Sequence, residues 1–198
     1  ARDGAVWRGE ARWGRIGALP GDHNALNACA GLALIEALGH DARAAFETLE
    51  RFAGLPHRLQ TVHAARGIRF IDDGLATTPE AAAFAVEAFK DTPLALLLGG
   101  EDREQDYAWL AGRLETVDTI KAILTLADNG ARVKAAFQAG RHGGVTRHVP
   151  DIEDAVAQAV AALPEGGVVL LSPAAPRSKA FESYVERGAA FKAAAERL

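Results

Sequence analysis

Residues 94–100 read LALLLGG, a run of apolar side chains that ends in two glycines. An amphipathic strand or helix would place polar residues at regular intervals, and this run has none. A short, continuous apolar run is typical of a strand covered on both faces, as strands in parallel sheets are. The stretch therefore predicts a central strand of a parallel sheet, with the glycines at its carboxyl end.

Strand and helix patterns alternate around this run. A hairpin is predicted about Arg66-Gly67, and a helix is predicted after Thr78-Pro79, where threonine caps the helix and proline suits its first turn. Further strands are predicted at 122–126, 145–148 and 168–171, with helices near 106–115, 130–139, 151–163 and 180–197. This alternation indicates an α/β fold with a Rossmann-like, doubly wound and mostly parallel sheet.

The first part of the chain follows another pattern. Residues 4–17 predict a short β-hairpin, and helices are predicted from about residue 24 to 38 and after the capping residue Asp41. Gly54-Leu55-Pro56 breaks the second helix. A domain boundary is therefore expected near residue 59, with 1–58 and 59–198 as the two parts.

Composition excludes several classes of protein. The 198 residues are 49% apolar and carry a formal net charge of −4. A duplex nucleic-acid binder needs a basic face, and a membrane helix needs about 20 apolar residues in a row, so neither partner is expected. A single cysteine, Cys29, cannot form an internal disulfide. A cytoplasmic protein is expected.

The start of the chain is also informative. It reads ARDGAVW, without a signal peptide, and the sequence contains no methionine. We therefore expect the chain to be a fragment or a processed piece.

Ligands of doubly wound sheets bind beyond the carboxyl ends of the strands. The loop at 72–78 begins with Asp72 and Asp73 and precedes a helix N-terminus, which favours anions. Its two carboxylates could bind ribose hydroxyls or a metal-bound phosphate. Alternatively, they simply end a strand.

Two further loops carry polar side chains. In the loop at 99–106, Arg103 could bind a carboxylate through two N–H groups, or the loop is a solvated helix start with an exposed ion pair. In the loop at 172–178, Ser172, Arg177 and Ser178 offer hydrogen-bond donors, or the loop is a plain connection.

Two motifs precede the sheet. Asn24 and Asn27 follow His23 and share a helix face by their spacing, so their amides could read a purine edge or cap the helix. Arg58, next to His57, could stabilise a transferring phosphoryl group or form a salt bridge between domains. The histidines show no metal-ligand spacing, and no metal site is predicted.

The ordered set of motifs resembles the Mur ligase family of ATP-dependent peptide ligases, in its glutamate-adding branch. The resemblance runs from about residue 14 to the C-terminus, and its segments are GDHNALNA (21–28), GLPHRLQ (54–60), FIDDGLATTPEAA (70–82), LLLGGEDREQDY (96–107) and LLSPAAPRSKAFESYVERGAAF (170–191).

This resemblance implies that residues 1–58 are the tail of a partial α/β central ATPase domain. Residues 59–198 would be the glutamate-binding C-terminal domain. No GxxxxGK[ST] phosphate loop is present. In the family, that loop and the ligands of the metal lie upstream, so this piece alone is expected to be inactive.

The resemblance also implies roles for particular residues. His57 and Arg58 match catalytic residues that reach ATP. The nucleotide contacts would be His23, Asn24, Asn27 and Asp73, and the glutamate contacts would be Thr77, Arg103, Arg177 and Tyr184.

The implied reaction uses ATP and Mg²⁺ to join glutamate to UDP-N-acetylmuramoyl-L-alanine through an acyl phosphate, in peptidoglycan synthesis, with a monomeric enzyme. Leu75 and Arg103 stand where the family usually has lysines, a pattern that resembles the sister group that adds L-glutamate. Two alternatives stay open: a related ligase, such as a folylpolyglutamate synthetase or a later Mur enzyme, and a non-catalytic nucleotide-binding module.

Overall fold

The computed structural model describes residues 1–17, 19–140 and 144–198. The chain divides into two compact units, Ala1–Leu55 and Pro56–Leu198. The assignment of these parts to a central and a C-terminal ligase domain stays a prediction. No helix in the described part of the chain combines the length and apolar character needed to cross a bilayer.

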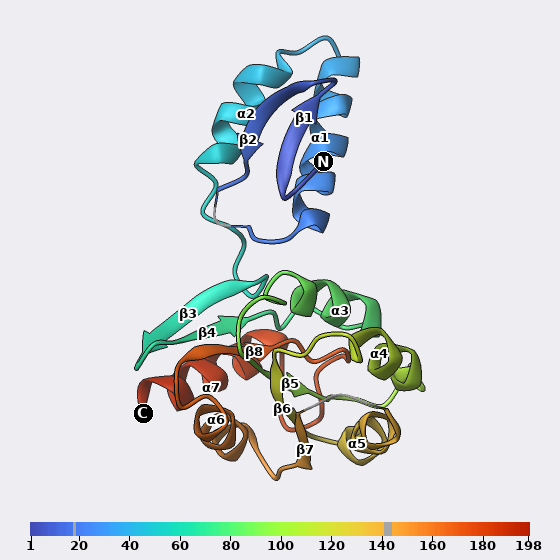
Figure 1. The fold of residues 1–198 in the computed structure, drawn as a ribbon, viewed down its shortest axis with the longest axis vertical. Coiled ribbons are helices and arrows are strands. Elements are labelled where there is room, and N and C mark those ends of the chain that lie inside the picture. The colour runs from blue at the N-terminus through green and yellow to red at the C-terminus, as the bar shows by residue number, and fades with distance from the viewer. Residues whose placement is uncertain (18, 141–143) are drawn as a thin grey trace. The chain divides into compact units, whose positions relative to one another are not determined.

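The first unit contains a hairpin and two helices (Figure 1). These elements are β1 (Ala5–Arg8), β2 (Ala11–Arg15), α1 (Asp22–Ala37) and α2 (Ala42–Glu50). Asp41 caps α2, as predicted, because its Oδ1 accepts hydrogen bonds from the N–H groups of Arg43 and Ala44. A small core surrounds Phe46, which is completely buried.

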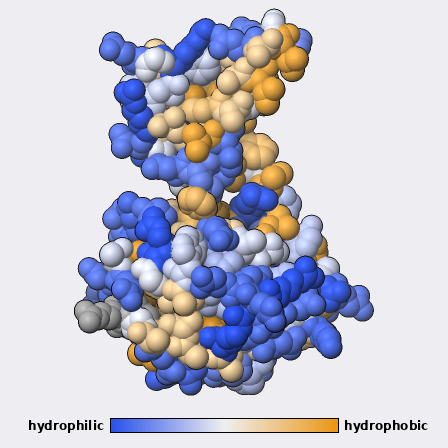
Figure 2. Space-filling model, turned by 90° about the vertical axis from the view of Figure 1, so that its right-hand side faces the viewer, coloured by the Kyte–Doolittle hydropathy of each residue, from blue (hydrophilic) through white to orange (hydrophobic). Residues whose placement is uncertain are grey.

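Helix α1 exposes apolar side chains as well as burying them. Leu26 near the start of the helix, Leu34 near its end and Leu38 at its C-cap are 62%, 64% and 71% exposed. Figure 2 shows apolar side chains gathered on a face of this unit. Contiguous apolar surface of this kind marks a contact surface.

The second unit is built on a six-stranded sheet with the order β3-β4-β8-β5-β6-β7. Its strands are β3 (Gln60–Ala65), β4 (Ile68–Asp72), β5 (Leu94–Leu98), β6 (Ile120–Thr125), β7 (Val145–His148) and β8 (Gly167–Leu171). Only the β3–β4 pair is antiparallel among the strands of this sheet in the described residues. The prediction of a mostly parallel α/β sheet is confirmed.

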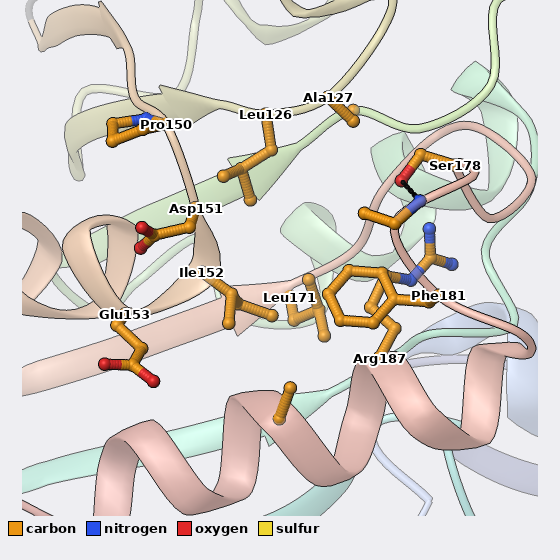
Figure 3. A pocket seen from close by; sticks show the side chains of 13 residues that line it. Leu126, Ala127, Pro150, Asp151, Ile152, Glu153, Leu171, Ser178, Phe181 and Arg187 are labelled. Carbon is orange, nitrogen blue, oxygen red and sulfur yellow. Dashed lines mark hydrogen bonds between the residues drawn. The ribbon is translucent and has the colours of Figure 1, made fainter.

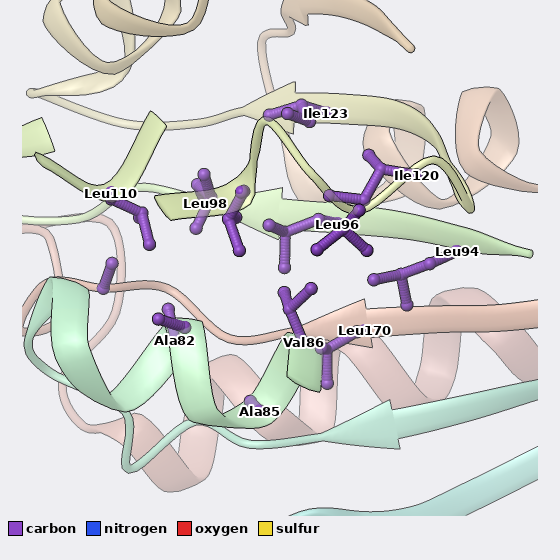
Figure 4. Packing of buried hydrophobic residues seen from close by; sticks show 14 of the residues in the cluster. Ala82, Ala85, Val86, Leu94, Leu96, Leu98, Leu110, Ile120, Ile123 and Leu170 are labelled. Carbon is purple, nitrogen blue, oxygen red and sulfur yellow. The ribbon is translucent and has the colours of Figure 1, made fainter. Parts of the chain in front are cut away.

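Helices cover both faces of this sheet (Figure 1). One face carries α3 (Pro79–Glu87), α4 (Tyr107–Leu114) and α5 (Gly130–Ala139), and the other carries α6 (Ile152–Ala161) and α7 (Tyr184–Glu196). Strand β5 supplies Leu94, Leu96 and Leu98 to the first face (Figure 4) and Ala95 and Leu97 to the second. All five are fully buried. The apolar run was correctly read as a strand covered on both faces.

The last helix begins later than predicted. The sequence indicated a start near residue 180, whereas α7 begins at Tyr184. Ser183 is its N-cap, and its Oγ accepts a hydrogen bond of 3.1 Å from the N–H of Glu186. The residues before it belong to the loop that follows β8.

The winding of the chain opens a crevice beside β5. Strands β8 and β5 are neighbours, but the chain leaves β5 toward α4 on one face and leaves β8 toward α7 on the other. Ligands of open α/β sheets bind at such a switch point, beyond the carboxyl ends of the strands. The polar loops predicted from the sequence follow these strand ends.

Candidate functional site

The three polar loops are hydrogen-bonded to one another. The N–H of Gly99 donates to the carbonyl of Pro173 at 2.8 Å, and the N–H of Glu101 donates to that of Pro176 at 3.0 Å. The side-chain amide of Gln105 donates to the carbonyl of Thr77 at 3.1 Å. The loops at 72–78, 99–106 and 172–178 therefore form one continuous rim.

The two glycines after β5 are needed for this packing. A Cβ on Gly99 would lie 2.0 Å from the carbonyl oxygen of Leu126, and one on Gly100 would lie 1.9 Å from that of Pro176. Gly99 also has a φ of +123°, which other residues rarely adopt. The glycines therefore let the neighbouring loops approach each other closely.

Asn129 holds the rim in place through two buried hydrogen bonds. It is 1% exposed, its Oδ1 accepts from the N–H of Gly100 at 2.9 Å, and its Nδ2 donates to the hydroxyl of Tyr107 at 2.6 Å. The Tyr107 hydroxyl in turn donates to the carbonyl of Ala174 at 3.2 Å. Sequence reasoning did not single out Asn129, because its partners lie far away along the chain.

Asp73 is a buried carboxylate at the end of β4. Its Oδ1 accepts from the N–H of Leu59 at 3.2 Å, and its Oδ2 accepts from the hydroxyl of Ser172 at 2.8 Å. Burial raises the pKa of Asp73 to about 6, although both hydrogen bonds and the charge of Arg58 act in the opposite direction. Asp73 and Arg58, two predicted site residues, therefore lie within electrostatic reach of each other.

Asp72 and His57 form a pair beside it. Oδ2 of Asp72 lies 2.7 Å from Nδ1 of His57, and Oδ1 accepts from the N–H of Gly74 at 2.8 Å. The ring of Tyr184 meets the His57 ring edge-on, with 5.4 Å between centroids. His57 and Tyr184, predicted for different ligands, are thus in contact.

Arg187 on α7 contacts the loops at 72–78 and 172–178, and the sequence analysis missed it. Its guanidinium is buried and donates to the carbonyls of Gly74 at 2.9 Å and Pro176 at 3.4 Å, while Nε has no partner in the described residues. Burial lowers the pKa of Arg187 to about 10, against the opposing effect of Asp72. Little in the sequence signalled this role, because Arg187 directly follows Glu186 and resembles an ordinary charged residue of a helix surface.

Thr77, Arg103 and Arg177 are exposed on the rim. Arg103 donates from Nε and from a terminal nitrogen to one oxygen of Glu101, at 3.0 and 2.9 Å. This is the exposed ion pair of the alternative interpretation. Arg177 donates to the carbonyl of Phe181 at 2.8 Å. Both guanidiniums therefore have exposed surface left for an incoming anion.

The asparagines of the first unit differ in their surroundings. Asn24 is 5% exposed, and its Nδ2 donates to the carbonyl of Pro20 at 2.7 Å, whereas Asn27 is exposed. Helix α1 has Gly21 as its N-cap, without a side-chain cap hydrogen bond. The alternative of helix capping is therefore wrong for these residues. His23 lies half-buried next to Asn24.

A cavity of about 450 Å³ lies on the α6–α7 side of the rim (Figure 3). Its wall is mostly apolar, with Leu126, Ile152 and Phe181 facing inward, and Asp151 lies at the start of α6. Figure 3 shows Arg187 rising from α7 beside Phe181. Gly99 and Ser178 of the rim line the cavity, whereas Arg103 and Arg177 do not.

The described residues do not provide a set of ligands for a resident metal ion. Within residues 1–17, 19–140 and 144–198, no three His, Cys, Asp or Glu side chains group closely enough to hold one.

The fold and the rim define a member of the Mur ligase family. Residues 57–175 match the family described as "Mur ligase, glutamate ligase domain", and the chain belongs to this family.

Two relatives place it more closely. A UDP-N-acetylmuramoyl-L-alanine--L-glutamate ligase of Xanthomonas euvesicatoria is 41% identical over 178 residues, which cover 87% of this chain and 37% of the relative. A UDP-N-acetylmuramoylalanine--D-glutamate ligase of Dechloromonas aromatica is 37% identical over 99% of this chain and 43% of the relative. The chain is thus similar to glutamate ligases of both kinds and spans well under half of their length.

The fold has solved counterparts. Folylpolyglutamate synthase of Mycobacterium tuberculosis, solved in complex with ADP, superposes with a TM-score of 0.64 at 21% identity, over 93% of this chain and 43% of that one. At this identity the likeness shows the shared fold alone.

Proposed function

We propose that this chain holds the incoming glutamate within a longer, ATP-dependent ligase that extends UDP-N-acetylmuramoyl-L-alanine in peptidoglycan synthesis. The observation that carries the proposal is the continuous rim, whose loops carry the exposed side chains of Thr77, Arg103 and Arg177. Family membership and the names of the relatives support the same assignment.

Glutamate presents two carboxylates and one amine. Guanidinium groups bind carboxylates with charge-assisted, paired hydrogen bonds, so Arg103 and Arg177 suit its two acid groups. Arg103 already donates two hydrogen bonds to one carboxylate oxygen of Glu101, and a substrate carboxylate would take the place of Glu101. Thr77 and Tyr184 would complete the contacts and leave the amine free to react.

The nucleotide would be ATP. We propose that His23, Asn24 and Asn27 contact its base, and that Asp73, His57 and Arg58 contact its remaining parts. Mg²⁺ accompanies ATP in this proposal and has its ligands outside this chain. The cytoplasm is the proposed location.

In the proposed reaction, the carboxylate of the UDP-linked substrate takes the γ-phosphoryl group of ATP and releases ADP. The glutamate amine then attacks the acyl phosphate, loses a proton and expels phosphate to form the amide. Arg58 would stabilise the negative charge that develops on the transferred phosphoryl group. The rim would hold the amine close to the acyl carbon.

We further propose L-glutamate as the preferred enantiomer. Leu75 and Arg103 replace the lysines usual in the family, and a guanidinium presents its donors differently from an ammonium group. The carboxylates would therefore be held in another orientation. Exclusive use of D-glutamate by the longer enzyme would overturn this choice.

The test is phosphate release by the longer enzyme that contains this chain. We expect release only when ATP, UDP-N-acetylmuramoyl-L-alanine and glutamate are all present, and we expect Arg58→Ala to abolish it. Replacing the exposed Arg113 of α4 by alanine provides the matched control, which should keep full activity. Release with a folate or a tripeptide precursor in place of the stated substrate would contradict the proposal.

A further inference from the structure

The segment that carries His57 is held in an unusual backbone conformation. His57 and Leu59 have φ values of +59° and +47°, which are uncommon for residues with a side chain. Hydrogen bonds fix both: the carbonyl of His57 accepts from Leu75 at 3.2 Å, and the N–H of Leu59 donates to Asp73. The loop after β4 therefore determines where the His57 ring can lie.

The ring itself is fixed by Asp72. The side chain of Asp72 is 1% exposed, and one oxygen already accepts from the N–H of Gly74. The other oxygen lies 2.7 Å from Nδ1 of His57. Because an ionised carboxylate only accepts hydrogen bonds, the proton in this contact belongs to Nδ1. The lone pair of the neutral ring is then on Nε2.

Nε2 of His57 remains open. No group in the described residues bonds it, and the side chain keeps 17% of its surface exposed. Tyr184 meets the ring edge-on, with 5.4 Å between the ring centroids. When the ring is neutral, the exposed edge of His57 is therefore a hydrogen-bond acceptor whose direction is set by the contact with Asp72.

Gly188 makes room for this pair. A Cβ at Gly188 would lie 2.3 Å from Oδ2 of Asp72 and 2.6 Å from Nδ1 of His57. The glycine sits inside α7, where glycine weakens a helix. Its presence there is explained by the closeness of the Asp72–His57 contact to the helix backbone.

We propose that Asp72 is a positioning residue that locks His57 in the Nδ1–H tautomer, so that Nε2 accepts a hydrogen bond from a hydroxyl group of the nucleotide. A lone pair attracts a hydroxyl donor and repels a phosphate oxygen, so it suits a sugar hydroxyl of the nucleotide and not a phosphate. The identity of this ligand rests on the proposed function, whereas the tautomer rests on the geometry alone.

The 198-residue chain tests the tautomer directly. Long-range ¹H–¹⁵N spectra at about pH 8, where imidazoles are mainly neutral, distinguish a protonated from an unprotonated ring nitrogen. We expect Nδ1 of His57 to be protonated in the wild-type chain. A wild-type ring with its proton on Nε2 would overturn the proposal, whatever the variants do.

Asp72→Asn should reverse the tautomer. The N–H of Gly74 needs an acceptor and keeps the amide oxygen, so the amide nitrogen faces His57 and donates to Nδ1. The ring proton then moves to Nε2. Asp91→Asn, in the exposed turn after α3, is the matched control and should leave the His57 spectrum unchanged. A spectrum of Asp72→Asn identical to that of the wild type would count against the proposal.

A double-mutant cycle in the longer ligase tests the role. We expect Asp72→Asn to raise KM for ATP by about threefold to tenfold, as loss of a hydrogen bond between neutral groups does, with a smaller change in kcat. In a His57→Ala background the same change should raise KM less than about twofold, because the residue acts through His57. Equal losses in both backgrounds would show a merely structural role and contradict the proposal. If the wild-type enzyme shows no ligase activity, the proposed function fails, and the spectra still decide the tautomer.

Discussion

The hydroxyl of Ser172 donates a hydrogen bond of 2.8 Å to Oδ2 of Asp73, and this bond joins the carboxyl ends of the neighbouring strands β8 and β4. The carboxylate is 7% exposed, so the bond lies away from water. Burial raises the pKa of Asp73 to about 6 from an ordinary value of 3.8. The folded chain therefore binds a proton here more tightly than the unfolded chain does.

This difference predicts a pH dependence of stability. The contribution of Asp73 is fully present below about pH 4 and is lost as the pH rises through about 6, and the loss amounts to about 3 kcal/mol in total. Asp73→Asn removes this titration. The free energy of unfolding of the wild type should therefore fall relative to the variant between these pH values, as measured by urea unfolding followed through amide resonances of the second unit. A difference that stays constant with pH would show that Asp73 does not titrate in this range.

Two helical glycines should respond in opposite ways to alanine. Gly112→Ala in α4 should stabilise by about 0.5–1 kcal/mol, because nothing lies within 4 Å of the new Cβ. Gly188→Ala in α7 should destabilise by about 1–3 kcal/mol, because its Cβ would meet Asp72 and His57. Thermal unfolding of both variants measures the contrast. Equal stabilisation by the two changes would mean that the space beside Gly188 is not filled as described.

Removing the side chain of Asn129 should lower the free energy of unfolding more than removing most other polar side chains. Asn129→Ala leaves the buried N–H of Gly100 and the hydroxyl of Tyr107 without this partner, at an expected cost of about 2–3 kcal/mol in unfolding free energy. Tyr107→Phe should cost about 1 kcal/mol, and the double variant should cost less than the sum, since the two side chains share a hydrogen bond. Additive costs would indicate that the two residues act separately.

The fold was predictable from the sequence because its signals are local. The apolar run of β5, the Thr78-Pro79 start of α3 and the Asp41 cap of α2 all act over a few residues, and each is confirmed. The start of α7 was placed too early, since apolar spacing continues into the preceding loop and Ser183 gave a weaker signal.

The site was predictable only in part. Its three loops could be named because the topology of a doubly wound sheet brings strand ends together. Contacts such as Asp72–His57 and Arg187–Gly74 join residues 15 and 113 positions apart, and no local pattern encodes them. Their geometry depends on the packing of α7 against the sheet.

Glu101 should compete with the substrate for Arg103. Its carboxylate occupies two donors of the guanidinium, and the pair is exposed, so its effect on stability should stay within about 1 kcal/mol. In the longer ligase, Glu101→Gln should lower KM for glutamate severalfold, because the neutral amide holds Arg103 less tightly. Steady-state kinetics with glutamate varied measures this effect, and Glu115→Gln, at the end of α4, is the control. A raised KM would show instead that Glu101 supports the arginine in its binding position.

The most direct test of the central claim, that the rim of this unit holds glutamate, is a comparison of KM for glutamate and for ATP in the longer ligase. Thr77→Val, Arg103→Ala and Arg177→Ala should each raise KM for glutamate by about tenfold or more, as loss of a hydrogen bond to a charged group does, and should leave KM for ATP within about twofold. An unchanged KM for glutamate in all three variants would contradict the account.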